Sequence, residues 1–199
     1  MAEVEAGRTR VFLFQFRHPR ESGDPFNGSL SLVMDSRLRG NDGISVPDYV
    51  DESFIMNMQN DIVTLTKGWL GTPYHHQASL KGVGCDCLGL VRGVWRERFG
   101  EEPELPPAYA PDWAEAGLEE TLAEAGRRHL IEVPPLVFEA GDVLLFRWKP
   151  HLPAKHAGIA IDRTRMIHAQ EGACVSEAAL SSWWLKRLVF AFRFPERSN

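Results

Sequence analysis

The chain has 199 residues, of which 44% are hydrophobic and 25% are charged, a composition typical of one folded domain with additional segments. Its formal net charge of −5, from 22 basic and 27 acidic residues, argues against a dedicated nucleic-acid-binding protein. No apolar run approaches the ~18–20 residues of a membrane span, and the first residues lack the basic start of a secretory signal. We therefore expect no membrane contact and synthesis in the cytoplasm without a signal peptide. Three cysteines are an odd number and indicate a reducing compartment rather than a disulfide framework.

Residues 1–57 differ in character from the rest of the chain. Residues 11–16 have strand propensity, but residues 17–25 and 35–43 are polar, rich in turn formers and without periodicity. These two segments resemble translated copies of an inverted DNA repeat. Residues 35–37 can be encoded by a DNA sequence whose reverse complement encodes the Arg-Glu-Ser found at residues 20–22. We interpret residues 1–57 as a non-native or disordered extension, with Met56 or Met58 as the natural start. A genuine but disordered N-terminal arm is the alternative, and in either case the folded domain covers residues 58–197.

The folded domain is expected to begin with a helix. Ile62, Leu65, Trp69 and Leu70 recur at helical spacing after Asp61, and the Gly-Thr-Pro sequence at residues 71–73 then breaks the helix.

Residues 82–95 contain the candidate nucleophile. Gly82 and Gly84 leave room for a substrate, and Asp86 is placed to cap a helix that Gly100 ends. Cys87 then falls in the first turn, where the helix dipole and free N–H groups stabilise a thiolate. The alternative is that Cys87 is a small buried apolar residue of the helix.

A second amphipathic helix is predicted after a proline-rich acidic loop at residues 101–107, and Gly126 is expected to end it. Its apolar residues at helical spacing are Trp113, Leu118, Leu122 and Ala125.

The remaining chain is predicted to form short strands. In residues 141–148, Val143 and Leu145 face one way and Leu144 and Phe146 the other, so this strand is expected to be central. A strand starting at His156 turns through residues 163–165 into a second strand that carries His168. Pairing of these strands in a hairpin would place the two imidazoles side by side on one face. A closing strand is predicted at residues 188–194.

Three motifs in this order resemble the NlpC/P60 family of cell-wall peptidases: Gly-Thr-Pro-Tyr at residues 71–74, Asp-Cys-Leu-Gly-Leu-Val at 86–91 and His-Ala-Gly-Ile-Ala-Ile at 156–161. The resemblance extends from residue 60 to residue 195. It implies an α+β, papain-like fold in which N-terminal helices, with the cysteine at a helix N-terminus, pack on a small antiparallel sheet. The chain departs from the family pattern at Leu88, where serine is usual, and at His75 and His76, which replace a glycine pair and which we interpret as rim residues.

The resemblance implies a catalytic triad of Cys87, His156 and His168. In acyl transfer Cys87 would attack an amide carbonyl, His156 would accept and return the proton, and His168 would orient His156. The backbone N–H of Cys87 and the phenol of Tyr74 are candidates for holding the oxyanion, and Asp86 is a further candidate substrate-binding residue. His151 is the competing base, ranked lower because it lies in a loop between prolines.

The expected reaction is hydrolysis of an amide in the peptide stem of peptidoglycan, between D-glutamate and a diamino acid, without a cofactor or metal. Within the family, the chain looks most like peptidases of phage tails and gene-transfer-agent particles. This implies particle proteins as partners and action at the cell wall. A thiol amidase or acyltransferase and a non-catalytic wall-binding or tail module remain alternatives. So does a zinc site formed by Cys85, Cys87, His156 and His168.

Overall fold

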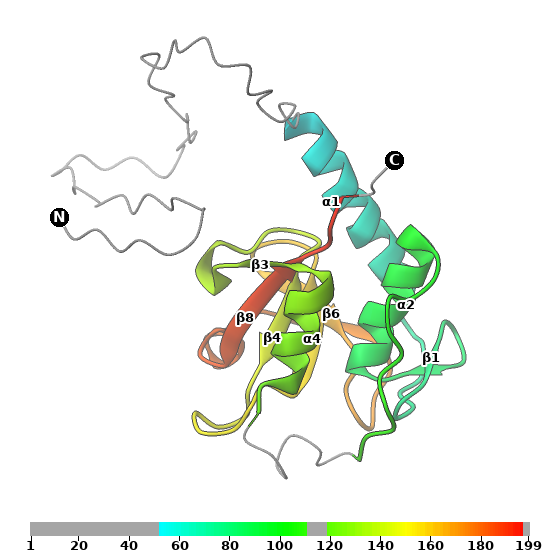
Figure 1. Cartoon of the computed structure of the whole chain (residues 1–199), viewed down its shortest axis with the longest axis vertical. Helices are drawn as coiled ribbons and strands as arrows, with labels where there is room; N and C mark the ends of the chain where they lie inside the picture. Colours follow the sequence, from blue (N-terminus) through cyan, green and yellow to red (C-terminus); the bar gives the residue numbers. More distant parts are fainter. Residues whose placement is uncertain (1–51, 111–118, 197–199) are drawn as a thin grey trace, which may run out of the picture. The chain divides into compact units, whose positions relative to one another are not determined.

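A six-stranded antiparallel sheet forms the centre of the fold (Figure 1). The computed structural model describes residues 52–110 and 119–196, with side chains described from residue 57 onward. The strand order is β3-β8-β4-β5-β6-β7, so the predicted central position of the strand at residues 143–146 is confirmed. The strands are β3 (Ile131–Val133), β4 (Val143–Phe146), β5 (His156–Ala160), β6 (Arg165–His168), β7 (Ser176–Ala179) and β8 (Leu188–Arg193).

Both faces of the sheet are buried at β4, as the apolar alternation of this strand predicts. Val143 and Leu145 join a core cluster with the helices, whereas Leu144 and Phe146 join a second cluster on the opposite face. Successive residues of a strand point to opposite faces. A strand with four apolar residues in a row can therefore contribute to two cores.

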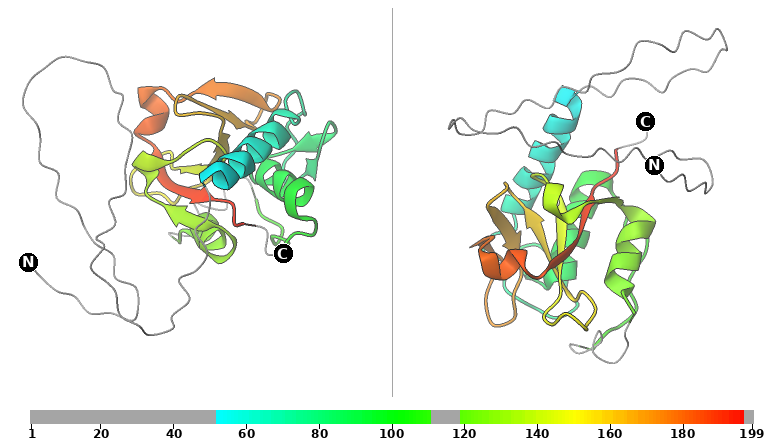
Figure 2. Two further views of the ribbon diagram at one scale, coloured as in Figure 1. Left: turned by 90° about the horizontal axis from the view of Figure 1, so that it is seen from above. Right: turned by 90° about the vertical axis from the view of Figure 1, so that its left-hand side faces the viewer.

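Helices α1 (Glu52–Lys67), α2 (Cys87–Phe99) and α4 (Thr121–His129) supply the helical side of the first core cluster. Helix α1 packs against α2, and α2 packs against β5; Figure 2 shows α1 and α2 side by side next to the sheet. The contact between α2 and β5 brings the predicted cysteine to the strand that carries His156.

Helix α1 is longer at its start than the sequence pattern predicted. It begins at Glu52 and ends at Lys67, so the predicted domain boundary between residues 57 and 58 falls inside it. Trp69 is buried beyond the helix, while Leu70 is exposed, because the chain has already turned at Gly68. The interpretation of residues 1–57 stays a prediction, and residues 1–51 lie outside the described part of the chain.

The prediction that Gly126 ends the second amphipathic helix is wrong. Helix α4 continues to His129, and Gly126 lies inside it, where an added Cβ would come within 2.8 Å of the Phe192 ring. The glycine therefore permits close packing of α4 on β8 and does not stop the helix. Trp113 and Leu118, predicted for the same helix, lie outside the described residues.

Shorter elements complete the fold: β1 (Ser79–Leu80), β2 (Gly84–Cys85), η1 (Pro135–Val137) and α5 (Ser182–Leu185). The sequence pattern did not predict β1, β2, β3 or β7, because these short strands lack the apolar runs by which β4 and β6 were recognised. The α+β, papain-like fold class is confirmed. No helix in residues 52–110 or 119–196 is both long enough and apolar enough to cross a membrane.

Candidate active site

The N-terminus of α2 is held by a buried carboxylate. Asp86 has extended backbone angles (φ −99°, ψ −172°), and its Oδ1 accepts a hydrogen bond of 2.7 Å from the N–H of Gly89. This is the N-cap that the sequence predicted. Oδ2 accepts hydrogen bonds from the N–H of Gln77 (2.8 Å) and the hydroxyl of Tyr109 (2.5 Å). Both oxygens are thus engaged by the protein itself, and a role of Asp86 in substrate binding stays a prediction.

Tyr109 and His76 belong to this network, and the sequence pattern did not identify either contact. The two rings meet edge to face with centroids 5.1 Å apart. His76 Nε2 lies 2.8 Å from the carbonyl oxygen of Tyr109, and its Nδ1 lies 3.7 Å from Asp86 Oδ2. His76 is therefore part of the support of the α2 N-terminus and more than a rim residue. Tyr109 is 23 residues from Asp86 in sequence, and no local pattern connects them.

Cys87 is half-buried, and its thiol lies against the first residues of β5. Its Sγ is 4.0 Å from the carbonyl oxygen of Lys155. Burial, and then the nearby Asp86 carboxylate, raise the pKa of the thiol to about 11, against the opposing effect of N–H groups of Ala157, Leu88 and Cys87 itself. The expectation that the helix N-terminus makes this thiol acidic is therefore wrong for the resting site, because desolvation outweighs the N–H groups.

His156 and His168 form the contact that the hairpin predicts. The pairs Ile159–Ile167 and Ala160–Met166 set the register of β5 and β6, and His156 Nε2 lies 2.9 Å from His168 Nδ1. An added Cβ at Gly158 would approach His168 Cβ to 3.4 Å and Met166 Sδ to 2.8 Å. The glycine thus leaves room on β5 for the side chains of Met166 and His168.

Aromatic rings enclose the histidine pair. Trp184 stacks on His156 with centroids 5.5 Å apart and meets His168 edge-on at 5.2 Å; Trp148 lies 5.4 Å from His156. Burial, and then the neighbouring His168, lower the pKa of His156 to about 3, and burial also lowers the pKa of His168. Both imidazoles are therefore neutral near pH 7, and Nδ1 of His156 is the nitrogen that His168 does not use.

The adjacent residues Trp183 and Trp184 lie in two different environments. Trp184 is partly buried and packs on the second core cluster, whereas Trp183 is 46% exposed. Their neighbour Trp148, two residues after the end of β4, also contacts His156, and no pattern in the sequence predicts that contact.

Tyr74 lies in the electrostatic environment of the thiol. Its backbone bridges to Cys85, and burial, followed by the charges of Asp86 and Cys87, raises the pKa of its phenol to about 12. The phenol therefore remains protonated and able to donate a hydrogen bond. Its role at an oxyanion stays a prediction.

The other candidate residues lie apart from this arrangement. His151 is exposed in a turn, in contrast to the buried, hydrogen-bonded His156. Cys85 is fully buried in the core, Cys174 is exposed, and all three cysteines are free. Within the described ranges, no three or more His, Cys, Asp or Glu side chains are grouped to hold a metal ion. The alternative zinc site of Cys85, Cys87, His156 and His168 is therefore not formed.

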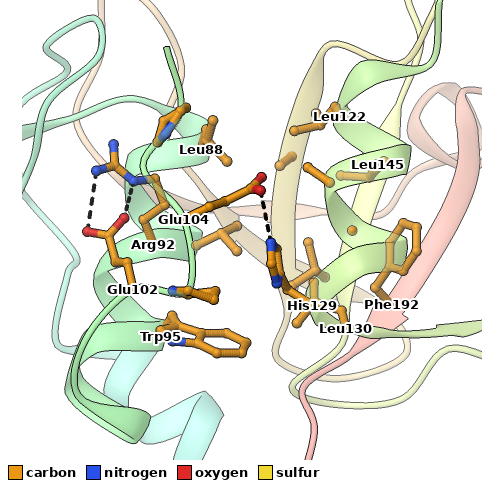
Figure 3. Close-up of a pocket in the computed structure, with 17 residues that line it drawn as sticks. Leu88, Arg92, Trp95, Glu102, Glu104, Leu122, His129, Leu130, Leu145 and Phe192 are labelled. Carbon is orange, nitrogen blue, oxygen red and sulfur yellow. Dashed lines mark hydrogen bonds and ion pairs between the residues drawn. The ribbon is translucent and has the colours of Figure 1, made fainter.

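An apolar cavity of about 120 Å³ lies between α2 and α4 (Figure 3). Leu88 and Ala157, which follow Cys87 and His156 in sequence, contribute to its wall, but none of the three proposed triad residues does. Arg92 and Glu102 form an ion pair (2.5 Å) beside the cavity. The cavity is thus separate from the three candidate triad residues.

The chain is similar in sequence and in fold to known proteins. The murein DD-endopeptidase MepS/murein LD-carboxypeptidase of Escherichia coli K12 is 25% identical over 177 residues, covering 86% of this chain and 84% of that protein. An NlpC/P60 family protein from Bacillus cereus has a similar fold, with a TM-score of 0.50 and 19% identity over 68% of this chain and 40% of that one. The NlpC/P60 domain of the peptidoglycan hydrolase SagA is matched over 98% of its length and 68% of this chain, with 23% identity and a TM-score of 0.48. The NlpC/P60 family pattern matches residues 71–193, and the chain belongs to the NlpC/P60 family.

Proposed function

We propose that this protein is a thiol peptidase that hydrolyses an amide bond in the peptide stem of peptidoglycan. The observation that carries the proposal is the 2.9 Å contact between His156 and His168 at the start of β5, where the Cys87 thiol lies against the backbone of Lys155. The activities named for the relatives support the choice of a murein substrate.

The tautomer of His156 follows from the task of a base. To accept the thiol proton, Nδ1 of His156 must be unprotonated, so Nε2 carries the hydrogen and donates it to Nδ1 of His168. His168 then fixes both the orientation and the tautomer of His156. The low pKa values of both histidines keep the acceptor nitrogen free in the resting site.

The reaction proceeds by acyl transfer. As the sulfur of Cys87 attacks the amide carbonyl, its proton passes to His156, and the backbone N–H of Cys87 with the phenol of Tyr74 hold the oxyanion. The C–N bond then breaks, and His156 returns the proton to the leaving amine. Water, deprotonated by His156, cleaves the thioester and releases the carboxylate product. The neutral resting pair means that sulfur becomes a thiolate only as the proton is transferred.

We further propose that the bond cleaved lies between D-glutamate and the diamino acid, and that the enzyme acts at the cell wall as a component of a phage-tail or gene-transfer-agent particle. The resemblance of the motifs, and of the spacing of His156 and His168, to peptidases of phage tails and gene-transfer-agent particles supports this assignment. The Escherichia coli relative is named for DD- and LD-bonds, and cleavage of one of these bonds is the alternative assignment.

Mass spectrometry of muropeptides released from defined peptidoglycan tests the reaction and the bond together. The wild-type chain should release products ending in D-glutamate, and Cys87→Ala should release none. Products of DD- or LD-cleavage would overturn the bond assignment, and wall binding without any product would favour the non-catalytic module. Proteomics of purified particles tests the setting, because absence of the chain from them contradicts a tail component.

A further inference from the structure

A hollow of about 430 Å³ is lined in part by Trp148, which also contacts His156. The loop after β4 and the segment between α5 and β8 form it, and we call it the basic hollow. The backbone N–H of Arg147 donates to the carbonyl oxygen of Arg187 at 3.0 Å, which joins the two segments. The lining residues are Arg147, Trp148, Lys149, Pro150, Lys186, Arg187 and Val189.

The charge of the hollow is opposite to that of the chain. Four of its seven lining residues are cationic, whereas the whole chain has a formal charge of −5. Glu120 neutralises Arg147 through an ion pair of 2.7 Å. Among residues 52–110 and 119–196, neither Lys149 nor Lys186 forms an ion pair, and both are exposed. A local excess of positive charge thus remains for an anion to neutralise.

Hydrogen bonds to backbone carbonyls hold the two arginines in place. Arg147 Nη1 donates to the carbonyl of Pro150, and Arg187 Nη1 donates to that of Trp183. The Nε atoms of both arginines are covered by the protein. The two guanidinium groups therefore contribute positive charge to the wall of the hollow.

Aromatic contacts connect the hollow to the reaction centre. Trp148 lines the hollow and lies 5.4 Å from the His156 ring. Trp183 lies 5.7 Å from Trp148 and carries the Arg187 guanidinium 3.8 Å above its ring. A group bound in the hollow is therefore one tryptophan away from the catalytic histidine.

We propose that the basic hollow is a binding site for a carboxylate of the substrate, an assignment that rests on the proposed peptidase function. Stem peptides of peptidoglycan carry free carboxylates on residues close to the amide that is cleaved. Arginine and lysine side chains bind such groups through charge-assisted hydrogen bonds. Lys149 and Lys186 supply exposed ammonium donors, the two arginines add positive charge, and Trp148 connects the hollow to His156.

Equilibrium binding to the full chain carrying Cys87→Ala tests the site without turnover. The probes are a soluble stem tripeptide with free carboxylates and the same peptide with its carboxylates amidated. Lys186→Glu and Lys149→Glu should each weaken binding of the free peptide about tenfold and leave binding of the amidated peptide unchanged. Lys67→Glu is the matched control, because Lys67 is an exposed lysine at the end of α1 and carries the same charge change away from the hollow.

The outcomes separate this proposal from the proposed function. If the charge reversals change the Kd of the free and amidated peptides equally, or no more than Lys67→Glu does, the carboxylate site is wrong even when the wild type cleaves peptidoglycan. Loss of binding to a glycerol-phosphate polymer, with peptide binding intact, would assign the hollow to phosphate instead. If binding of the free peptide falls as expected but the wild-type chain releases no muropeptide, only the peptidase function fails.

Discussion

The two ends of the candidate site are built from different chemistry. The nucleophile end is polar: the Asp86 carboxylate, 3% exposed, receives three hydrogen bonds from Gly89, Gln77 and Tyr109. The base end is aromatic, with His156 in contact with the rings of Trp148 and Trp184. Polar contacts fix the position of a helix terminus, whereas aromatic enclosure removes water from an imidazole and keeps it neutral.

Burial at the two ends shifts the pKa values of Cys87 and His156 in opposite directions. Burial raises the pKa of Cys87 and lowers that of His156, so both shifts oppose a thiolate–imidazolium pair. The helix N-terminus favours an anion at Cys87, but the adjacent Asp86 carries negative charge into the same region. In the proposed mechanism the thiol therefore loses its proton during attack.

The largest effect should come from the nucleophile. Cys87→Ser should lower kcat by about 10⁴-fold or more, because loss of a triad nucleophile removes covalent catalysis. Release of muropeptides measures the loss, and circular dichroism checks the fold. Cys174→Ser, at an exposed site, is the control and should retain activity. Activity in Cys87→Ser together with an inactive Cys85→Ala would show that the wrong cysteine was assigned.

Substitutions of the two histidines should distinguish proton transfer by His156 from orientation of its ring by His168. His156→Gln should reduce kcat by about 10²-fold or more, since no base remains. His168→Gln should cost less, because an amide oxygen can still accept the hydrogen bond from Nε2 of His156. Steady-state kinetics on a soluble stem peptide compares them. If exposed His151→Ala is as damaging as His156→Gln with the fold intact, the base is misassigned.

Alkylation tests whether the resting pair is neutral. With a pKa of about 11, roughly 10⁻⁴ of the Cys87 thiol is ionised at pH 7, so modification by iodoacetamide should still accelerate above pH 9. Mass spectrometry of the peptide that contains Cys87 gives the rate at each pH. A plateau below pH 8 that disappears in His156→Gln would demonstrate an ion pair instead.

Burial of His156 at the aromatic end should make the free energy of unfolding depend on pH. Between the unfolded histidine pKa of ~6.5 and the folded value of about 3 for His156, the unfolded chain binds a proton that the native site does not. The free energy of unfolding should therefore fall as pH falls through this window, by about 1.4 kcal/mol per pH unit for this group, and be unaffected above it. Denaturant titrations from pH 7 to pH 4 measure the slope. His156→Gln should show a shallower slope than the wild type, and an identical slope would contradict burial of a neutral imidazole.

The smallest effect should come from the polar end. Tyr109→Phe removes one of the three donors to Asp86 and should lower the free energy of unfolding by about 1 kcal/mol. Asp86→Asn should cost more, about 1–3 kcal/mol. An amide nitrogen in place of Oδ2 can accept neither the bond from Gln77 nor the bond from Tyr109. Urea unfolding of both variants ranks them. Equal stability of Asp86→Asn and wild type would show that the carboxylate does not hold the helix terminus.

Local features of the sequence were enough to locate much of the fold and the site. Asp86 as a cap, Cys87 in the first turn, Gly100 as the end of α2, and the alternation in β4 all follow from short-range rules of helix capping and strand periodicity. The hairpin of β5 and β6 also follows from a short turn, and it placed His168 beside His156. Gly126 failed as a helix stop because its role is to accommodate Phe192 of a distant strand.

Only the tertiary structure decided the properties that depend on distant segments. Tyr109 reaches Asp86 across 23 residues, and Trp184 covers His156 from beyond β7; no sequence period links either pair. The protonation states were decided in the same way, because desolvation depends on everything packed around a group, whereas a helix N-terminus is a local feature. The sequence by itself therefore determined which residues stand at the ends of α2 and β5, and the packing around them determined the opposite directions in which the pKa values of Cys87 and His156 are shifted.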